Sequence, residues 1–173
     1  MSDPILFTER LAVRQWTAAD RDRAFSVYSC WEVAQWLGST PRALEEPIEA
    51  LHLIERFRLR SADPRFGVWA LERRDGGAVA GSVMLLPLPD GGGEVEIGWH
   101  LHPDSWGLGF ATEAARAVLA KGFADGVDEI RALVRPGNHP SAAVCRRIGM
   151  VLTGRTGRWY GADMEEFLAS RTR

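Results

Sequence analysis

The most informative part of the sequence is residues 94–114, which read EVEIGWHLHPDSWGLGFATEA. Side chains alternate strictly over residues 94–102, which predicts a β-strand with one packed face and one polar face. The packed face carries Val95, Ile97, Trp99 and Leu101, and the polar face carries Glu94, Glu96, Gly98, His100 and His102. From Phe110 to Phe123 the apolar residues recur at helical spacing, so a helix follows the strand.

Gly107 and Gly109 lie between this strand and this helix. Glycine lets the backbone approach a ligand closely, and the helix that follows presents unpaired N–H groups and the positive end of its dipole. This arrangement is typical of a diphosphate-binding turn, although glycine pairs also precede helices in plain turns. A dinucleotide fingerprint needs a third glycine at position 112, where Thr112 stands, and a Walker A motif is absent.

On the N-terminal side, the patterns predict a strand at 11–16, helices at about 18–30 and 47–60, and strands at 66–72 and 78–86. Turn-rich separators make the strands from 66 to 102 an antiparallel meander. In the second helix the apolar positions at helical spacing are Ile48, Leu51, Ile54 and Leu59.

On the C-terminal side, a strand is expected at 130–134, a helix at 140–148, and strands at 151–155 and 164–169. Asn138 or His139 is placed to cap the last helix, and Gly149 to end it. The order of elements predicts an α+β (mixed α/β) fold with one layer of sheet, in a single domain that spans 1–173.

Composition excludes several classes of protein. The 173 residues carry 21 Lys plus Arg and 23 Asp plus Glu, a net charge of −2, which argues against nucleic acid as a partner. Two cysteines are too few for a disulfide scaffold, and no apolar run is long enough to span a membrane, so we expect a cytoplasmic protein with no membrane partner.

Four segments, in order along the chain, carry a resemblance to a known family. The run from Trp106 to Ala111 is similar to the acetyl-CoA loop R/Q-x-x-G-x-G/A, with Trp in place of Arg or Gln. The other three are TERLAVR at 8–14, EIGWHL at 96–101, and NHPSAAVCRRIGM at 138–150, where Met150 replaces a usual Phe. The chain resembles the GCN5-related N-acetyltransferases (GNAT), in the branch of ribosomal-protein N-terminal acetyltransferases (RimJ/RimL-like).

This resemblance implies a central, mostly antiparallel twisted sheet of about six or seven strands, with helices on both faces. The fourth and fifth strands would splay apart, and the pantetheine arm would lie between them. The implied activity is transfer of the acetyl group from acetyl-CoA to a primary amine, either a protein N-terminal α-amine or a small-molecule amine. Transfer would be by direct attack in a ternary complex, without metal.

The resemblance also implies roles for single residues. Glu96 would face the acceptor and take its proton, directly or through water, with His100 as a less favoured base. A simply solvated face is the alternative for this strand. Ser141 would protonate the leaving thiolate; Cys145 lies one helical turn later, and packing in the core is its simpler interpretation.

The expected contacts to acetyl-CoA are Leu101, Trp106, Gly107, Leu108, Gly109, Phe110, Ala111, Thr112, Asn138, Ser141 and Arg147. The N–H near Leu101 would polarise the thioester carbonyl. Asn138 would bind pantetheine or serve only as a helix cap, and Arg147 or Arg146 would reach a phosphate or remain solvated. Trp31 and Trp36 would line the acceptor site together with Glu96, or fill the core.

Two other hypotheses remain open at this stage. One is an acyl-CoA-binding or sensor module on the same fold without catalysis. The other is a metal site at His100-x-His102 with His52 or His139, but spacing marks no further ligand, and no metal is expected. The identity of the acceptor amine and assembly as a homodimer are also left open.

Overall fold

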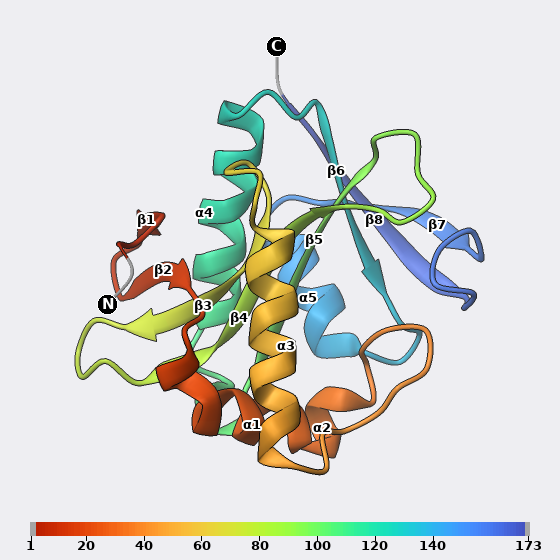
Figure 1. Ribbon diagram of the computed structural model, residues 1–173. Coiled ribbons are helices and arrows are strands. Elements are labelled where there is room, and N and C mark those ends of the chain that lie inside the picture. Colours follow the sequence, from red (N-terminus) through yellow and green to blue (C-terminus); the bar gives the residue numbers. More distant parts are fainter. Residues whose placement is uncertain (1–2, 172–173) are drawn as a thin grey trace.

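The computed structural model describes residues 3–171 and consists of one twisted sheet with helices on both faces (Figure 1). The strands are β1 (Leu6–Phe7), β2 (Leu11–Gln15), β3 (Gly67–Arg73), β4 (Val79–Pro87), β5 (Val95–Leu101), β6 (Glu129–Val134), β7 (Val151–Thr156) and β8 (Met164–Ser170). The helices are α1 (Arg21–Ser29), α2 (Trp31–Ala34), α3 (Pro47–Arg60), α4 (Phe110–Ala124) and α5 (His139–Arg147).

The eight strands lie in the order β1-β2-β3-β4-β5-β6-β8-β7. Neighbouring strands are antiparallel except for β5 and β6, which are parallel. The mixed α/β architecture with a mostly antiparallel sheet is therefore confirmed. The sheet has one strand more than expected because β1, only two residues long, pairs with β2.

The two faces of the sheet carry separate apolar clusters. One cluster joins β2–β6 and β8 to α4 and α5, with Val118 and Cys145 at 0% exposure. The other joins α1 and α3 to the opposite face, with Val27 and Ala50 at 0% exposure. Strands β3 and β4 contribute to both clusters and are thus covered on both sides.

Helix α3 has the predicted bounds, and Pro47 occupies its first turn, where the missing N–H costs nothing. Its buried face is Ala50, Ile54 and Phe57. The prediction that Ile48 and Leu59 face the core is wrong, since they are 55% and 60% exposed. The small side chain of Ala50 lies on the face that packs against α1, so packing rather than hydrophobicity alone sets the rotation of the helix.

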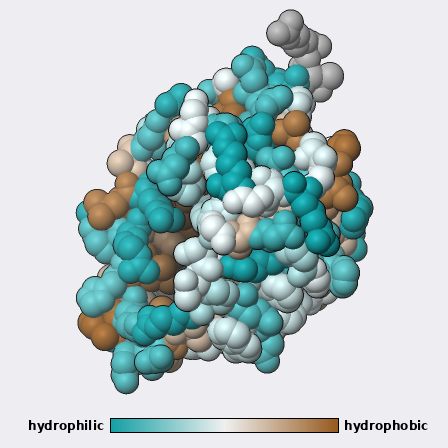
Figure 2. Space-filling view, turned by 90° about the vertical axis from the view of Figure 1, so that its right-hand side faces the viewer, coloured by the Kyte–Doolittle hydropathy of each residue, from teal (hydrophilic) through white to brown (hydrophobic). Residues whose placement is uncertain are grey.

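The alternative interpretation of the polar face of β5, that it is simply solvated, does not hold. Glu96 is 5% exposed and is contacted by Tyr160 of the β7–β8 connection, and His100, beside Tyr28 of α1, is only partly accessible. Figure 2 views the molecule from the side of β7 and β8, where the surface is mainly hydrophilic and hydrophobic residues show as separate patches. Within residues 3–171, no helix is long and apolar enough to cross a membrane.

Candidate active site

Strands β5 and β6 separate shortly after they begin. Only two pairs join them, Val95 with Ile130 and Glu96 with Arg131, although β5 continues to Leu101 and β6 to Val134. In Figure 1 the two strands diverge and α5 lies behind the opening. The expected splay between the fourth and fifth strands is therefore present, numbered here as β5 and β6 because β1 precedes them.

The backbone of β5 directs polar groups into this opening. In an antiparallel pair, the N–H and C=O groups of alternate residues point toward the same neighbouring strand. His102, just beyond β5, donates its N–H to the carbonyl of Ala80 in β4, so the odd-numbered Trp99 and Leu101 direct their N–H and C=O groups toward the β6 side. Both residues lie beyond the last pair with β6, where an extended ligand could take the place of a strand.

The turn before α4 is built for close backbone approach. Gly107 and Gly109 have φ angles of +73° and +81°, which side chains rarely adopt, and a Cβ at Gly107 would meet only open space. Within residues 3–171, no protein acceptor is found for the backbone N–H groups of 107–112. This run of free donors at the start of α4 could bind an anion.

Trp106 closes one side of this turn. Its indole Nε1–H donates to the carbonyl of Leu101 at 2.8 Å, while the residue remains 49% exposed. Phe110 differs from the other residues of the turn because it is buried at 5% exposure and packs in the core cluster. Ala111 and Thr112 form the first turn of α4 and are partly accessible.

A brace from the β1–β2 connection holds this turn, and the sequence patterns did not reveal it. The Arg10 guanidinium donates to the carbonyl of Leu108 at 2.9 Å and pairs with Glu113 at 2.7 Å. Glu113 also accepts hydrogen bonds from the Arg10 N–H and the Thr8 hydroxyl. The TERL segment therefore fixes the carboxylate of α4's first turn and the carbonyl of the glycine turn at once.

Glu96 lies at the point where β5 and β6 part. Burial raises the pKa of its carboxyl to about 7, against opposing effects from a hydrogen bond donated by the Tyr160 hydroxyl and from the nearby charge of Arg60. A buried carboxyl that titrates near neutrality can accept and release a proton under physiological conditions. Neither Tyr160 nor Arg60 was predicted as a site residue.

His100 in β5 and His102 just after it both lie within hydrogen-bonding distance of other side chains. His100 Nδ1 lies 3.3 Å from the Tyr28 hydroxyl, and burial lowers the pKa of its imidazole to about 4. His102 Nδ1 accepts from the N–H of Asp104, and its Nε2 lies 3.0 Å from the Ser26 hydroxyl. Among residues 3–171, no group of three or more His, Cys, Asp or Glu is placed to hold a metal ion.

Helix α5 begins beside the opening. Asn138 caps it by accepting a 3.3 Å hydrogen bond from the Ser141 N–H. The Ser141 side chain is partly accessible, whereas Cys145 is fully buried, and desolvation raises the pKa of its thiol to about 12. Arg147 is exposed, and its carbonyl accepts from the Arg116 guanidinium of α4 at 2.9 Å.

Trp31 and Trp36 belong to neither apolar cluster, although Val33 between them packs in the cluster under α1 and α3. Trp31 is 55% exposed and Trp36 partly so, which rules out the core-filling interpretation for these two residues. The Arg135 guanidinium, just after β6, donates to the carbonyls of Gly38 and Ser39. This contact ties the connection after α2 to the end of β6.

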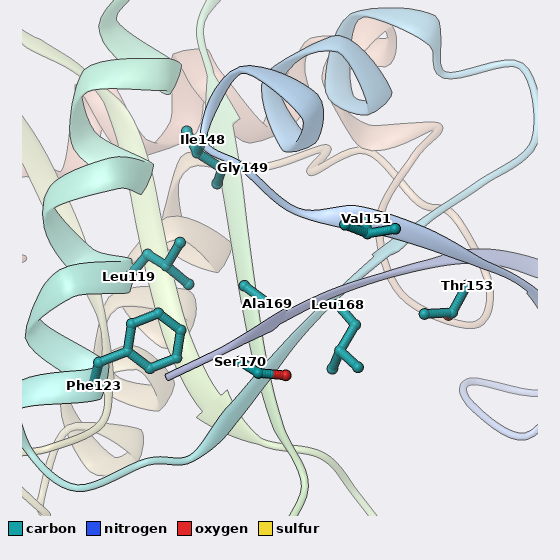
Figure 3. Close-up of a pocket in the computed structure, with 9 residues that line it drawn as sticks. All are labelled: Leu119, Phe123, Ile148, Gly149, Val151, Thr153, Leu168, Ala169 and Ser170. Carbon is teal, nitrogen blue, oxygen red and sulfur yellow. The ribbon is translucent and has the colours of Figure 1, made fainter. Parts of the chain in front are cut away.

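A hollow of about 570 Å³ lies elsewhere, between the C-terminal half of α4 and the β7–β8 edge of the sheet (Figure 3). Its lining is mainly apolar: Leu119, Phe123, Ile148, Gly149, Val151, Thr153, Leu168, Ala169 and Ser170. Leu119 is ten residues along α4 from Gly109, a rise of about 15 Å at 1.5 Å per residue. The hollow is therefore distinct from the glycine turn.

Comparison with known proteins agrees with this geometry. The family model described as Acetyltransferase (GNAT) domain matches residues 10–151. The protein named uncharacterized N-acetyltransferase YoaA, from Bacillus subtilis (strain 168), is 32% identical over 152 residues, which cover 87% of this chain and 85% of that protein.

Solved structures share the fold. An acetyltransferase (GNAT family) from Bacillus anthracis has a TM-score of 0.81 at 21% identity, over 96% of this chain and 98% of that chain. Mycobacterium smegmatis RimJ in complex with CoA-disulfide has a TM-score of 0.77 at 19% identity, over 94% of this chain and 86% of that chain. With a diverging strand pair, a glycine turn and a family match over most of its length, the chain belongs to the GNAT family of acetyltransferases.

Proposed function

We propose that this acetyltransferase transfers the acetyl group of acetyl-CoA to a primary amine, a protein N-terminal α-amine or a small-molecule amine, by direct attack in a ternary complex. The observation that carries the proposal is Glu96, a buried carboxyl with a pKa of about 7 at the divergence of β5 and β6. The acceptor amine must lose a proton before it attacks, and a carboxyl with a pKa near 7 can take that proton.

The residues present fit acetyl-CoA. The free N–H groups of 107–112 suit its diphosphate, and the backbone of Trp99 and Leu101, which no strand pairs on the β6 side, suits an extended pantetheine arm. The Arg147 side chain is exposed beside Arg116 and could meet a phosphate of the nucleotide. Asn138 already caps α5, so its carbonyl oxygen has a structural role whether or not its amide N–H₂ also binds pantetheine.

Glu96 would remove the proton that makes the acceptor unreactive. At pH 7, deprotonation costs about 4–5 kcal/mol for a lysine-type amine of pKa near 10.4, and about 1 kcal/mol for an α-amine of pKa near 8. Glu96 accepts this proton directly or through a water, and it becomes a neutral carboxylic acid in a site that disfavours its charge. His100 is the poorer base, because its pKa is about 4.

Acetyl-CoA supplies the acetyl group as a thioester, whose carbonyl carbon the neutral amine attacks as the C–N bond forms and the C–S bond breaks. The N–H of Leu101 stabilises the negative charge that develops on the carbonyl oxygen. Ser141 donates its hydroxyl proton to the leaving sulfur and regains one from solvent. Cys145 is not suited to this role, because its side chain lies within the apolar cluster under α5.

The acceptor would enter opposite the glycine turn. Trp31 and Trp36 are accessible and belong to neither apolar cluster, so their rings could contact the acceptor. Glu96 faces the same side of the sheet as α1 and α3. We propose these three residues as the acceptor-binding set.

The test is a thiol-release assay with acetyl-CoA and a panel of peptides with free N-termini, polyamines and amino acids. The wild type is expected to acetylate at least one class, and Glu96→Gln to lose most of that rate while it binds CoA normally. Glu55→Gln, which changes an exposed carboxylate of α3 paired only with Arg58, is the control and should keep the rate. Tight CoA binding without turnover on any acceptor would support the acyl-CoA sensor instead.

A further inference from the structure

The connection between β7 and β8 reaches across the sheet to β5. Residues 157–163 form this connection, and two of them contact the strand that carries the proposed base. The Arg158 guanidinium pairs with Glu94 at 2.9 Å, and the Tyr160 hydroxyl donates to Glu96 Oε2. Glu94 immediately precedes β5 and lies two positions before Glu96, so the segment is attached at adjacent points.

Tyr160 is held in a backbone conformation that bulky residues rarely adopt. Its φ is +57°, and Gly161 follows at +60°. A left-handed conformation is strained for a residue with a Cβ and persists only when the surroundings fix it. Trp159, at 2% exposure with the Arg158 guanidinium 4.2 Å from its ring centroid, provides that anchor and turns the next side chain toward β5.

We propose that Tyr160 is a positioning residue for the reaction, whose hydroxyl orients the Glu96 carboxylate and keeps it available as a base. This inference rests on the proposed role of Glu96. The hydroxyl occupies Oε2, which leaves Oε1 to accept the proton of the incoming amine. Because a donated hydrogen bond favours the charged carboxylate, it offsets part of the effect of burial and lowers the pKa of Glu96.

Few other groups can set this pKa. Arg60 at the end of α3 acts on both Glu96 and Tyr160 through its charge. Arg131, the neighbour on β6, is engaged by Glu129 and Glu166, and Glu94 is paired with Arg158. His100 lies further along the same face beside Tyr28. Tyr160 itself stays protonated, because burial and the Glu96 carboxylate raise the pKa of its phenol above the usual range.

The test measures the Glu96 carboxyl directly, by ¹³C NMR titration of the full-length protein labelled at glutamate, with the signal assigned by its absence in Glu96→Gln. In Tyr160→Phe the midpoint is expected to rise by about one pH unit, the size of one hydrogen bond to a charged group. Arg155→Gln is the matched control: it removes an exposed ion pair with Asp163 of the same connection but keeps the phenol and its anchor. An unchanged midpoint in Tyr160→Phe, or an equal rise in Arg155→Gln, would overturn the inference.

Kinetics give a second measure. The acid limb of kcat/KM should move upward with the NMR midpoint, so that Tyr160→Phe loses roughly fivefold at pH 7 and stays within a factor of two of wild type at pH 9. A loss that is equal at both pH values contradicts the positioning role. If the wild type acetylates no amine, the proposed function fails, and the NMR titration still decides whether Tyr160 controls Glu96.

Discussion

Arg10 and Leu108 are joined by a 2.9 Å hydrogen bond from the guanidinium of one to the backbone carbonyl of the other, across 98 positions of sequence. The same guanidinium neutralises Glu113, a carboxylate in the first turn of α4 that would otherwise oppose an anion bound there. One side chain thus fixes the shape of the glycine turn and sets its charge.

Arg10→Ala is therefore expected to weaken CoA binding roughly tenfold, equivalent to about 1.4 kcal/mol. The turn would lose its brace, and Glu113 would lose its counter-charge. Isothermal titration calorimetry with CoA measures the change. Arg21→Ala serves as the control, because Arg21 pairs only with its exposed neighbour Asp22; equal affinity in the Arg10 variant and the control would contradict the brace.

Gly109→Asp should abolish CoA binding. The new side chain would put a negative charge beside the free N–H groups, and its Cβ would lie 3.4 Å from Arg10 Nη2. Gly126→Asp is the matched control: its φ of +90° imposes a similar backbone cost of about 1–2 kcal/mol, but it lies past the other end of α4. CoA affinity that survives in Gly109→Asp would remove the glycine turn from the diphosphate site.

Glu96→Gln should become more stable than wild type as pH rises. The folded-state pKa of Glu96 is raised from 4.5 to about 7, so its stabilising effect is complete below pH 4.5 and is lost as pH rises through 7. A glutamine has no charge to bury, so above pH 8 the variant should gain about 2–3 kcal/mol relative to wild type. Urea unfolding at pH 4.5 and 8.5 measures this difference; a gap that does not widen with pH would show that Glu96 titrates normally.

Ser141→Ala and Cys145→Ser distinguish the two candidate acids on α5. Ser141→Ala should lower kcat about a hundredfold, the lower end of what a lost proton donor costs, with little change in the Kd for CoA. Cys145→Ser should instead destabilise the fold by about 1–3 kcal/mol, because it buries a hydroxyl in an apolar cluster, while each folded molecule keeps its rate. The opposite result would transfer the role to Cys145.

Local patterns were sufficient to predict the elements around the site. The bounds of α3 and the passage from β5 through the glycine turn to α4 follow from alternation, helical spacing and glycine, which act between near neighbours. The rotation of α3 did not follow, since the choice of Ala50 over Ile48 as a buried residue depends on how closely α1 approaches.

The contacts that tune the site could not be predicted in the same way. Tyr160 is 64 positions from Glu96, and Thr8 is 105 positions from Glu113. No spacing rule links such residues, and Tyr160 lies in a connection that the strand patterns left unassigned. The burial of Glu96 likewise required knowing that the β7–β8 connection reaches this face of β5.

Because β5 pairs with β6 over only a short stretch, the sheet consists of two halves that are weakly joined by backbone hydrogen bonds. One half contains β1–β5 and the other contains β6, β8 and β7. Two residue pairs of β5 and β6 join the halves, and α4 packs against strands of both. A ligand in the opening would bridge the two halves of the sheet and so stabilise the fold. The stabilisation would grow with ligand concentration as RT ln(1 + [L]/Kd). The amides of β6 should therefore exchange with solvent more slowly as the ligand concentration rises.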